Sequence, residues 1–193
     1  MKKLIFCDID GTIVDGSRGM NEVSQKTTYA IEELKKDNYV VIASGRCRGL
    51  LDEKIKALHP SGYVLCNGAY AQILGKEIHA MYFQKSALDR IRTIVKRYDG
   101  FYIFETLDEM YVDSFASSSF RYFLQGWGKI LDGFKEEKED QDDKYLIAMI
   151  GFKNRNDLKK AKEELEGFVD LADHKMFSSC DVNIHGVNKA TGD

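Results

Sequence analysis

The sequence predicts an α/β fold with a parallel core sheet and an α+β block inserted into the chain of that core. Three apolar segments, 4–9, 39–43 and 63–66, each end in a short polar turn. A segment of helical length separates the first two, as in the right-handed crossover that joins parallel strands. After about residue 78 the pattern changes to mixed strand-like and helix-like segments, which indicates a separate sheet.

The core segments follow in chain order. Residues 4–9 are nearly all apolar, which is typical of a strand buried inside a parallel sheet. Ser24 can cap a helix that runs to about Asp37. The apolar face expected for this helix comprises Thr27, Ala30, Ile31 and Leu34. Residues 39–43 and 63–66 predict two further buried strands, and residues 49–58 predict a second helix.

The inserted block, 81–184, contains two clear helical patterns. One covers residues 86–98, and the other begins at a cap, Asn154 or Asn156, and ends near Glu166. Their buried faces are expected at Leu88, Ile91, Ile94 and Val95, and at Leu158, Ala161 and Leu165. The other expected elements are strands at 101–104, 110–112, 145–152, 168–171 and 176–184, a helix at 118–131, and a solvated charged loop at 136–144.

Composition excludes several classes of function. The net charge of −3 gives no reason to expect nucleic acid or an anionic membrane as a partner. The N-terminal apolar run is short and contains Asp8, so it predicts neither a signal peptide nor a membrane span, and we expect a cytoplasmic protein. The four cysteines form no C-x-x-C pair, which favours buried free thiols over disulfides or a zinc site.

The first polar turn carries two carboxylates, Asp8 and Asp10, directly behind an apolar strand. Alternate residues of a strand share a face, so both side chains are expected to point the same way. Two like charges this close need a divalent cation, or a cycle in which one of them takes up a proton. A bare Asp-x-Asp-Gly is also an ordinary turn, but the full Asp8-Ile9-Asp10-Gly11-Thr12 after such a strand favours catalysis.

The other two turns are polar as well. The second strand is followed by Ser44-Gly45-Arg46, and the third by Asn67-Gly68-Ala69. Carboxyl ends of parallel strands meet at one edge of the sheet, where open α/β sheets bind ligands. The sequence therefore predicts a single site built from all three turns.

These motifs, with the segment Gly186-Val187-Asn188-Lys189-Ala190-Thr191-Gly192, occur in the order of a known family. The chain resembles the haloacid dehalogenase superfamily, specifically Cof-type phosphatases with an α/β cap of the C2B type. The resemblance implies a Rossmann-like parallel core, residues 1–80 plus 185–193, and an α+β cap domain, residues 81–184. It extends over nearly the whole chain.

The resemblance also implies roles for individual residues. Asp8 matches the nucleophile that forms an aspartyl-phosphate, and Asp10 matches the general acid/base. Mg²⁺ is expected at Asp8 and at the backbone carbonyl of Asp10. Ser44 and the N–H of Gly45 would bind a phosphoryl oxygen, and Lys189 would supply positive charge to the phosphoryl group and to Asp8.

Some of these assignments have plain structural alternatives. Arg46 and Asn67 are expected to contact the substrate or the phosphate, but Arg46 could equally pair with an acidic neighbour. Ser44 could simply form its turn, and Lys189 judged alone could be a surface lysine. The four histidines show no metal-ligand spacing and are expected at the surface or in turns.

The family's fourth motif, an acidic loop after a further core strand, is not found before Asp193. The final Gly192-Asp193 lies too close to Lys189 to be that motif. The favoured explanation is that the sequence is a fragment of a longer phosphatase. The alternative is a short protein that binds metal weakly, as a homodimer that buries the bare sheet.

The function expected from the resemblance is Mg²⁺-dependent hydrolysis of a small phosphorylated metabolite, a sugar phosphate or related phosphoester. A phosphomutase of similar architecture is one alternative. A catalytically silent phosphate-binding protein is another, because the fourth motif is missing. A nucleotide-dependent oxidoreductase is disfavoured, since no G-x-G-x-x-G follows any strand.

Overall fold

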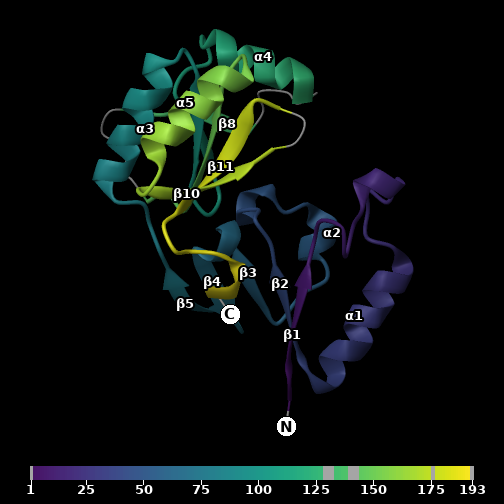
Figure 1. The fold of residues 1–193 in the computed structure, drawn as a ribbon. Helices are drawn as coiled ribbons and strands as arrows, with labels where there is room; N and C mark the ends of the chain where they lie inside the picture. The colour runs from purple at the N-terminus through teal and green to yellow at the C-terminus, as the bar shows by residue number, and fades with distance from the viewer. Residues whose placement is uncertain (1, 128–132, 139–143, 175–176, 192–193) are drawn as a thin grey trace. The chain divides into compact units, whose positions relative to one another are not determined.

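The computed structural model describes residues 2–127, 133–138, 144–174 and 177–191 (Figure 1). The chain divides into two compact units. The N-terminal unit comprises Met1–Ala80 and Asn188–Asp193, and the inserted unit comprises Met81–Val187. The second boundary lies three residues after the expected one, because Val187 bonds to the Ile184 carbonyl and His185 bonds to the Asp170 side chain, both within the inserted unit.

The N-terminal unit contains one five-stranded sheet. Its strands lie in chain order: β1 (Leu4–Asp8), β2 (Tyr39–Ala43), β3 (Gly62–Leu65), β4 (Tyr70–Ile73) and β5 (Lys76–Ala80). The first three are parallel, as predicted, and register pairs Asp8 with Ala43 and Ala43 with Val64. Their carboxyl ends therefore meet at one edge, which is where the three polar turns begin.

The crossover helix α1 (Gln25–Asp37) begins where predicted. The Ser24 Oγ accepts a hydrogen bond from the Thr27 N–H at 3.1 Å, which satisfies one free donor of the first turn. The expected apolar face is only partly correct, because Ile31 is buried while Leu34 remains 39% exposed. The helix packs mainly against a single strand, β2, so it covers less apolar surface than a helix lying across two strands.

Strand β1 is not buried as predicted. Leu4 and Phe6 are 52% and 40% exposed, because β1 is the end strand of the described sheet and has β2 on one side only (Figure 1). The helix expected at 49–58 is also wrong in extent: a 3₁₀ turn, Arg48–Leu50, precedes a four-residue helix, α2 (Glu53–Lys56). Asp52 separates them, since its side chain accepts from the Ile55 N–H at 3.0 Å and starts a new helix.

The β4–β5 hairpin was not predicted. Its turn residues, Leu74 and Gly75, both have positive φ, 49° and 78°. Two consecutive left-handed residues make the turn that matches the twist of a two-residue hairpin, and Asn-Gly is its usual sequence. Because leucine instead of asparagine occupies the first position, the sequence alone did not predict this turn.

The inserted unit has its own six-stranded sheet, in the order β10-β11-β9-β6-β7-β8. The bounds are β6 (Phe101–Glu105), β7 (Met110–Val112), β8 (Phe134–Glu136), β9 (Ile147–Gly151), β10 (Val169–Asp173) and β11 (Ser179–Ile184). All neighbours are antiparallel except the pair β7 and β8. The predicted separate sheet of an α+β unit is therefore confirmed, and β8 is an addition to it.

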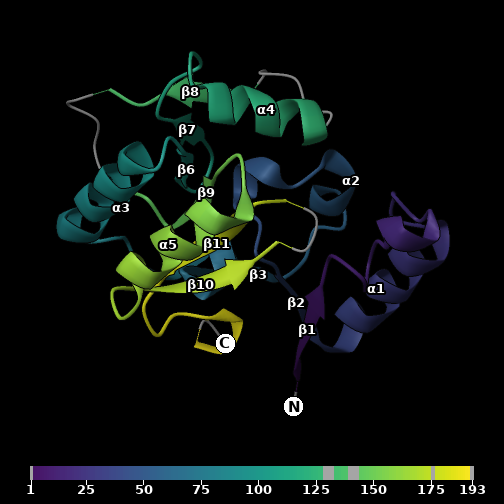
Figure 2. The same cartoon turned by 45° about the horizontal axis from the view of Figure 1, so that its top comes forward.

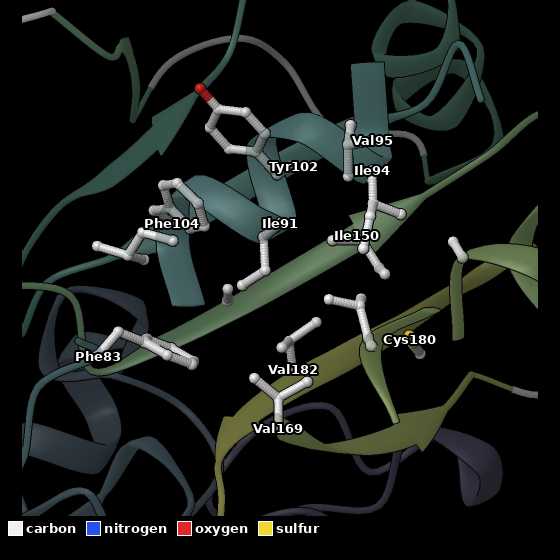
Figure 3. Close-up of a cluster of buried hydrophobic side chains, with 14 of the residues drawn as sticks. Phe83, Ile91, Ile94, Val95, Tyr102, Phe104, Ile150, Val169, Cys180 and Val182 are labelled. Atoms are coloured by element: carbon white, nitrogen blue, oxygen red, sulfur yellow. The ribbon is translucent and has the colours of Figure 1, made fainter. Parts of the chain in front are cut away.

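Helices cover both faces of this sheet (Figure 2). Helices α3 (Lys85–Arg97) and α5 (Arg155–Leu165) pack on one face, where all seven predicted apolar side chains are buried. Figure 3 shows three of them, Ile91, Ile94 and Val95, within this cluster. Helix α4 (Ser118–Trp127) packs on the other face through Phe120, Phe123 and Leu124. The rest of the helix expected at 118–131 lies outside the described residues. None of the helices in the described ranges has the length and apolar character needed to span a bilayer.

The expected solvated loop at 136–144 is partly wrong. Glu136 belongs to β8, and the Glu137 side chain is only 8% exposed. Glu137 accepts hydrogen bonds from Arg92 at 2.6 and 3.1 Å, from Tyr102 at 2.6 Å and from Tyr145 at 2.8 Å. Burial opposes its ionisation, but these bonds outweigh burial and lower the pKa of Glu137. Residues 139–143 of the expected loop lie outside the described residues.

Candidate active site

Asp8 stands at the end of β1 and pairs with Lys189, 181 residues later in the chain. The Asp8 Oδ1 accepts from the Lys189 Nζ at 3.0 Å and from the Ile9 N–H at 2.8 Å. Both side chains are about two-fifths exposed, so the pair is open to solvent. Lys189 begins a 3₁₀ turn, Lys189–Thr191, which is closed by the bond from the Thr191 N–H to the Asn188 carbonyl at 2.9 Å. The structure thus brings the first and last predicted site residues together.

Asp10 lies in a turn rather than on the strand. The Ile9 carbonyl accepts from the N–H groups of Thr12, Ile13 and Val14 at 3.2, 2.9 and 3.0 Å. Ile9 is completely buried, which anchors this turn in the core. Strand β1 ends at Asp8, so strand alternation does not decide the direction of Asp10 as expected. The turn holds the second carboxylate at the same sheet edge instead.

Asp10 forms a two-point ion pair with Arg46. The Arg46 Nη2 lies 2.6 Å from Asp10 Oδ1, and the Nε lies 3.1 Å from Oδ2. This parallel geometry is the most specific form of a carboxylate–guanidinium contact. The Asp10 side chain is 61% exposed, so the pair contributes at most about 1 kcal/mol to stability. The alternative in which Arg46 pairs with an acidic neighbour is what the structure contains.

Ser44 forms the turn that presents Arg46. It is fully buried, its N–H donates to the Val64 carbonyl at 2.8 Å, and its Oγ accepts from the Arg46 N–H at 3.2 Å. These bonds tie the end of β2 to β3 and fix the direction of the chain at Arg46. The turn-forming interpretation therefore describes this geometry, and the contact with a phosphoryl oxygen remains a prediction.

Asn67 lies in a left-handed turn against Gly45. Three consecutive residues, Cys66, Asn67 and Gly68, have φ of 52°, 53° and 95°. A Cβ on Gly45 would lie 2.7 Å from the Asn67 Oδ1, so a larger residue there would require the Asn67 side chain to shift. A Cβ on Gly68 would lie 2.0 Å from the Asn188 carbonyl oxygen. The Asn67 turn thus touches the segment that carries Lys189.

A disulfide joins Cys47 to Cys66, with the two Cα atoms 4.8 Å apart. The prediction of four free thiols is wrong for this pair and holds only for Cys7 and Cys180. The two bonded cysteines follow neighbouring parallel strands at the same sheet edge, which places their Cα atoms within bonding range. Their matching positions, one after Arg46 and one before Asn67, were the signal in the sequence.

Two carboxylates and two cations therefore meet at one edge of the N-terminal sheet. In the part of the chain that the structure describes, no group of three or more His, Cys, Asp or Glu side chains could hold a metal ion. Mg²⁺ usually binds one or two carboxylates and completes its shell with water and substrate phosphate. The oxygens of Asp8 and the Asp10 carbonyl are hard donors at an exposed site, so in type and access they fit this ion.

Comparison with known proteins agrees with this picture. Residues 5–192 match the family of haloacid dehalogenase-like hydrolases. The match covers nearly the whole chain, so the protein belongs to this family and is an enzyme of its hydrolase class. The predicted superfamily is confirmed.

A Bacillus subtilis (strain 168) protein named "Putative phosphatase YkrA" is 25% identical over 191 residues, which are 98% of this chain and 71% of the relative. The solved structures that share the fold include two phosphatases. One is BT1666 from Bacteroides thetaiotaomicron, a phosphatase of the same superfamily, with a TM-score of 0.80, 19% identity, and coverage of 100% of this chain and 70% of the other. The other is the subclass IIB sugar phosphatase BT4131, with a TM-score of 0.75, 19% identity, and coverage of 100% and 73%. The predicted α/β fold is confirmed.

Proposed function

We propose that this protein is a Mg²⁺-dependent phosphatase that hydrolyses a small phosphorylated metabolite through an aspartyl-phosphate on Asp8. The observation that carries the proposal is the pair of Asp8 and Lys189, 3.0 Å apart, at the edge that also holds Asp10 and Arg46. A nucleophile beside a fixed cation suits phosphoryl transfer, where catalysis is mainly positioning and charge stabilisation.

In the first step, Asp8 attacks the phosphorus atom and displaces the alkoxide. Lys189 orients the attacking oxygen and offsets the negative charge of the phosphoryl group. Bound Mg²⁺, held by Asp8 and the Asp10 carbonyl, would relieve repulsion between carboxylate and phosphate. The family relation to hydrolases, together with the relative named as a phosphatase, supports this reaction class.

Asp10 would move the proton in both steps. Protonated Asp10 gives its proton to the leaving oxygen, then takes one from the water that attacks the aspartyl-phosphate. The ion pair with Arg46 must open for this exchange, and the incoming phosphoryl oxygens offer Arg46 an equivalent partner. Arg46 would therefore pass from Asp10 to the substrate during binding.

The substrate class is proposed from similarity. BT4131 is a sugar phosphatase and shares the fold over the whole of this chain. The inserted unit, with its own sheet, is proposed as the cap that selects among phosphorylated metabolites. The chemistry at Asp8 is the same for any phosphate monoester, so selection belongs to residues outside the catalytic turns.

A second candidate function is phosphate binding without turnover. It is favoured by one observation, that the described residues supply only Asp8 and Asp10 as acidic groups at the site and no third metal ligand. In that case Lys189 and Arg46 would bind the phosphate group, but attack by Asp8 would be too slow to give measurable turnover.

The test is release of inorganic phosphate from a panel of sugar phosphates with and without Mg²⁺. We expect turnover that depends on Mg²⁺ and falls at least about a thousandfold in Asp8→Asn, as when a catalytic nucleophile is removed. Glu53→Gln, at a side chain 88% exposed on α2, is the control and should retain full activity. Equal rates in Asp8→Asn and wild type would rule out Asp8 as nucleophile. Saturable phosphate binding with no release from any substrate would select the second candidate.

A further inference from the structure

The Cys47–Cys66 disulfide joins the sequence neighbours of two predicted substrate-binding residues, Arg46 and Asn67. Cys47 follows Arg46 in the chain, and Cys66 precedes Asn67. Both sulfur-bearing residues are buried, with 2% and 1% of their surface exposed. The bond therefore joins the turn that presents Arg46 to the turn that presents Asn67.

The two turns also share backbone hydrogen bonds. The Cys66 N–H donates to the Arg46 carbonyl at 3.1 Å, and the Asn67 N–H donates to the Ser44 carbonyl at 3.3 Å. Both distances are at or beyond the long end of the usual N–H···O range, so the covalent link constrains two turns that are otherwise held by weak backbone hydrogen bonds. Any increase in the distance between the two turns moves Arg46 and Asn67 apart.

The backbone at the second turn needs such a constraint. Cys66 and Asn67 both have left-handed φ, which side-chain-bearing residues adopt only at a cost in free energy. Surrounding structure must hold residues in this conformation, and at Cys66 the disulfide and the hydrogen bond to the Arg46 carbonyl are contacts available to do so. Without the bond, the turn can relax toward a conformation that no longer brings Asn67 against Gly45.

We propose that Cys47 and Cys66 form a reversible covalent brace, whose oxidised state positions Arg46 and Asn67 to bind the phosphoryl group. Reduction releases the two turns and weakens phosphate binding. Arg46 and Asn67 are positioned by the brace, and the cysteines themselves do not touch substrate. The identity of the ligand rests on the proposed phosphatase function, whereas the brace itself does not.

The exchange is a two-electron step with a small-molecule disulfide of the glutathione type. One cysteine thiolate attacks that disulfide and releases one thiol, and the second cysteine then attacks the mixed disulfide and releases another. Cys47 and Cys66 are oxidised, the small disulfide is reduced to two thiols, and the two cysteine protons end on them. A small dithiol reverses the reaction. Both cysteines are buried, so exchange requires local opening of the turns.

The remaining cysteines provide matched controls. Cys180 is completely buried in the inserted unit, and burial raises the pKa of its thiol to about 12. Burial also raises the pKa of Cys7, which lies next to Asp8. A thiol with a raised pKa carries little thiolate and reacts slowly. Cys180→Ala thus removes a buried cysteine without altering the brace.

The first measurement is peptide mapping after alkylation in denaturant. After incubation with oxidised glutathione, we expect a linked peptide containing Cys47 and Cys66, and alkylated Cys7 and Cys180. After incubation with dithiothreitol, all four should be alkylated. Four alkylated cysteines in both samples would overturn the proposal.

The second measurement is the dissociation constant for inorganic phosphate, by calorimetry on oxidised and reduced protein. We expect oxidised protein to bind about twofold to tenfold more tightly, the range for ordering one or two side chains on binding. The double variant Cys47→Ser/Cys66→Ser should match reduced protein in both buffers, and Cys180→Ala should respond like wild type. Equal constants in both states would overturn the brace.

Turnover measured on the same samples separates the two proposals. We expect KM to rise on reduction by the same factor as the phosphate constant, while kcat changes little, because the cysteines do not contact reacting atoms. Redox-dependent phosphate binding without turnover would contradict the phosphatase function and leave the brace standing. Turnover with KM independent of redox state would contradict the brace and leave the phosphatase function standing.

Discussion

At the scale of single residues, Asp113 in the inserted unit is the residue whose burial most clearly lowers the free energy of unfolding when its carboxyl group is ionised. Its Oδ1 is buried and has no hydrogen-bond partner among the described residues. Burial raises the pKa of Asp113 to about 6. An acid whose folded pKa exceeds its unfolded value stabilises the fold while protonated, and that contribution is lost as pH rises from about 4 to about 6.

Asp113→Asn should therefore stabilise the protein at pH 8, by about 1–2 kcal/mol in the free energy of unfolding. At pH 4 the variant and wild type should be nearly equal, because the carboxyl is protonated in the folded protein. Urea unfolding at both pH values measures this. A gain that is as large at pH 4 as at pH 8 would contradict the role of the charge.

At the scale of elements, the contact between Gly68 and the Lys189 turn joins two motifs distant in sequence. Gly68→Ala would place a Cβ 2.0 Å from the Asn188 carbonyl oxygen. The clash should push Lys189 away from Asp8 and lower kcat/KM by about tenfold to a hundredfold, as small displacements at a reacting centre do.

Gly75→Ala is the matched control for this substitution. Gly75 also has positive φ, 78°, but a Cβ added there would have no atom within 4 Å. Both variants should lose about 1–2 kcal/mol of stability from the left-handed backbone, and only Gly68→Ala should lose activity. Equal losses of kcat/KM in the two variants would show that strain, rather than the clash, disturbs the site.

Periodic and capped elements were predictable from the sequence, and elements fixed by tertiary contacts were not. Helices α3 and α5 were predicted because their apolar residues recur at helical spacing. The β4–β5 hairpin was missed because its turn, Leu74-Gly75, lacks the usual residue types. The exposure of β1 depends on which elements pack beside it, and these cannot be predicted from the sequence of the strand alone.

The candidate site was likewise predicted only in part from the sequence. The motifs predicted which residues meet at one sheet edge, because parallel strands bring successive turns together. They left open whether Arg46 pairs with an acidic neighbour, and they predicted neither Asp10 as that partner nor the disulfide beside the pair. Both depend on distances between side chains of separate turns.

At the scale of the whole molecule, each unit has its own apolar cluster, which in the N-terminal unit comprises Val41, Ala43, Val64 and Ala71. In the inserted unit, clusters on both faces of the six-stranded sheet bury side chains from α3, α4 and α5. All four charged residues of the candidate site belong to the N-terminal unit. A fragment of residues 81–187 should therefore fold by itself and should not bind phosphate.

Cooperative thermal unfolding of that fragment, followed by circular dichroism, is the measurement. We expect a single sigmoidal transition, because a domain with its own core unfolds as one unit. A fragment without a transition, or one that binds inorganic phosphate as tightly as the whole chain, would contradict this division.

The central claim is that Asp8 becomes phosphorylated, and the direct measurement is the mass of the peptide containing Asp8 after an acid quench during turnover with Mg²⁺. The account predicts that this peptide gains one phosphoryl group, and that no such gain occurs in Asp8→Asn. Steady hydrolysis with the phosphoryl group on another peptide, or on none under conditions that trap the intermediate, would contradict it.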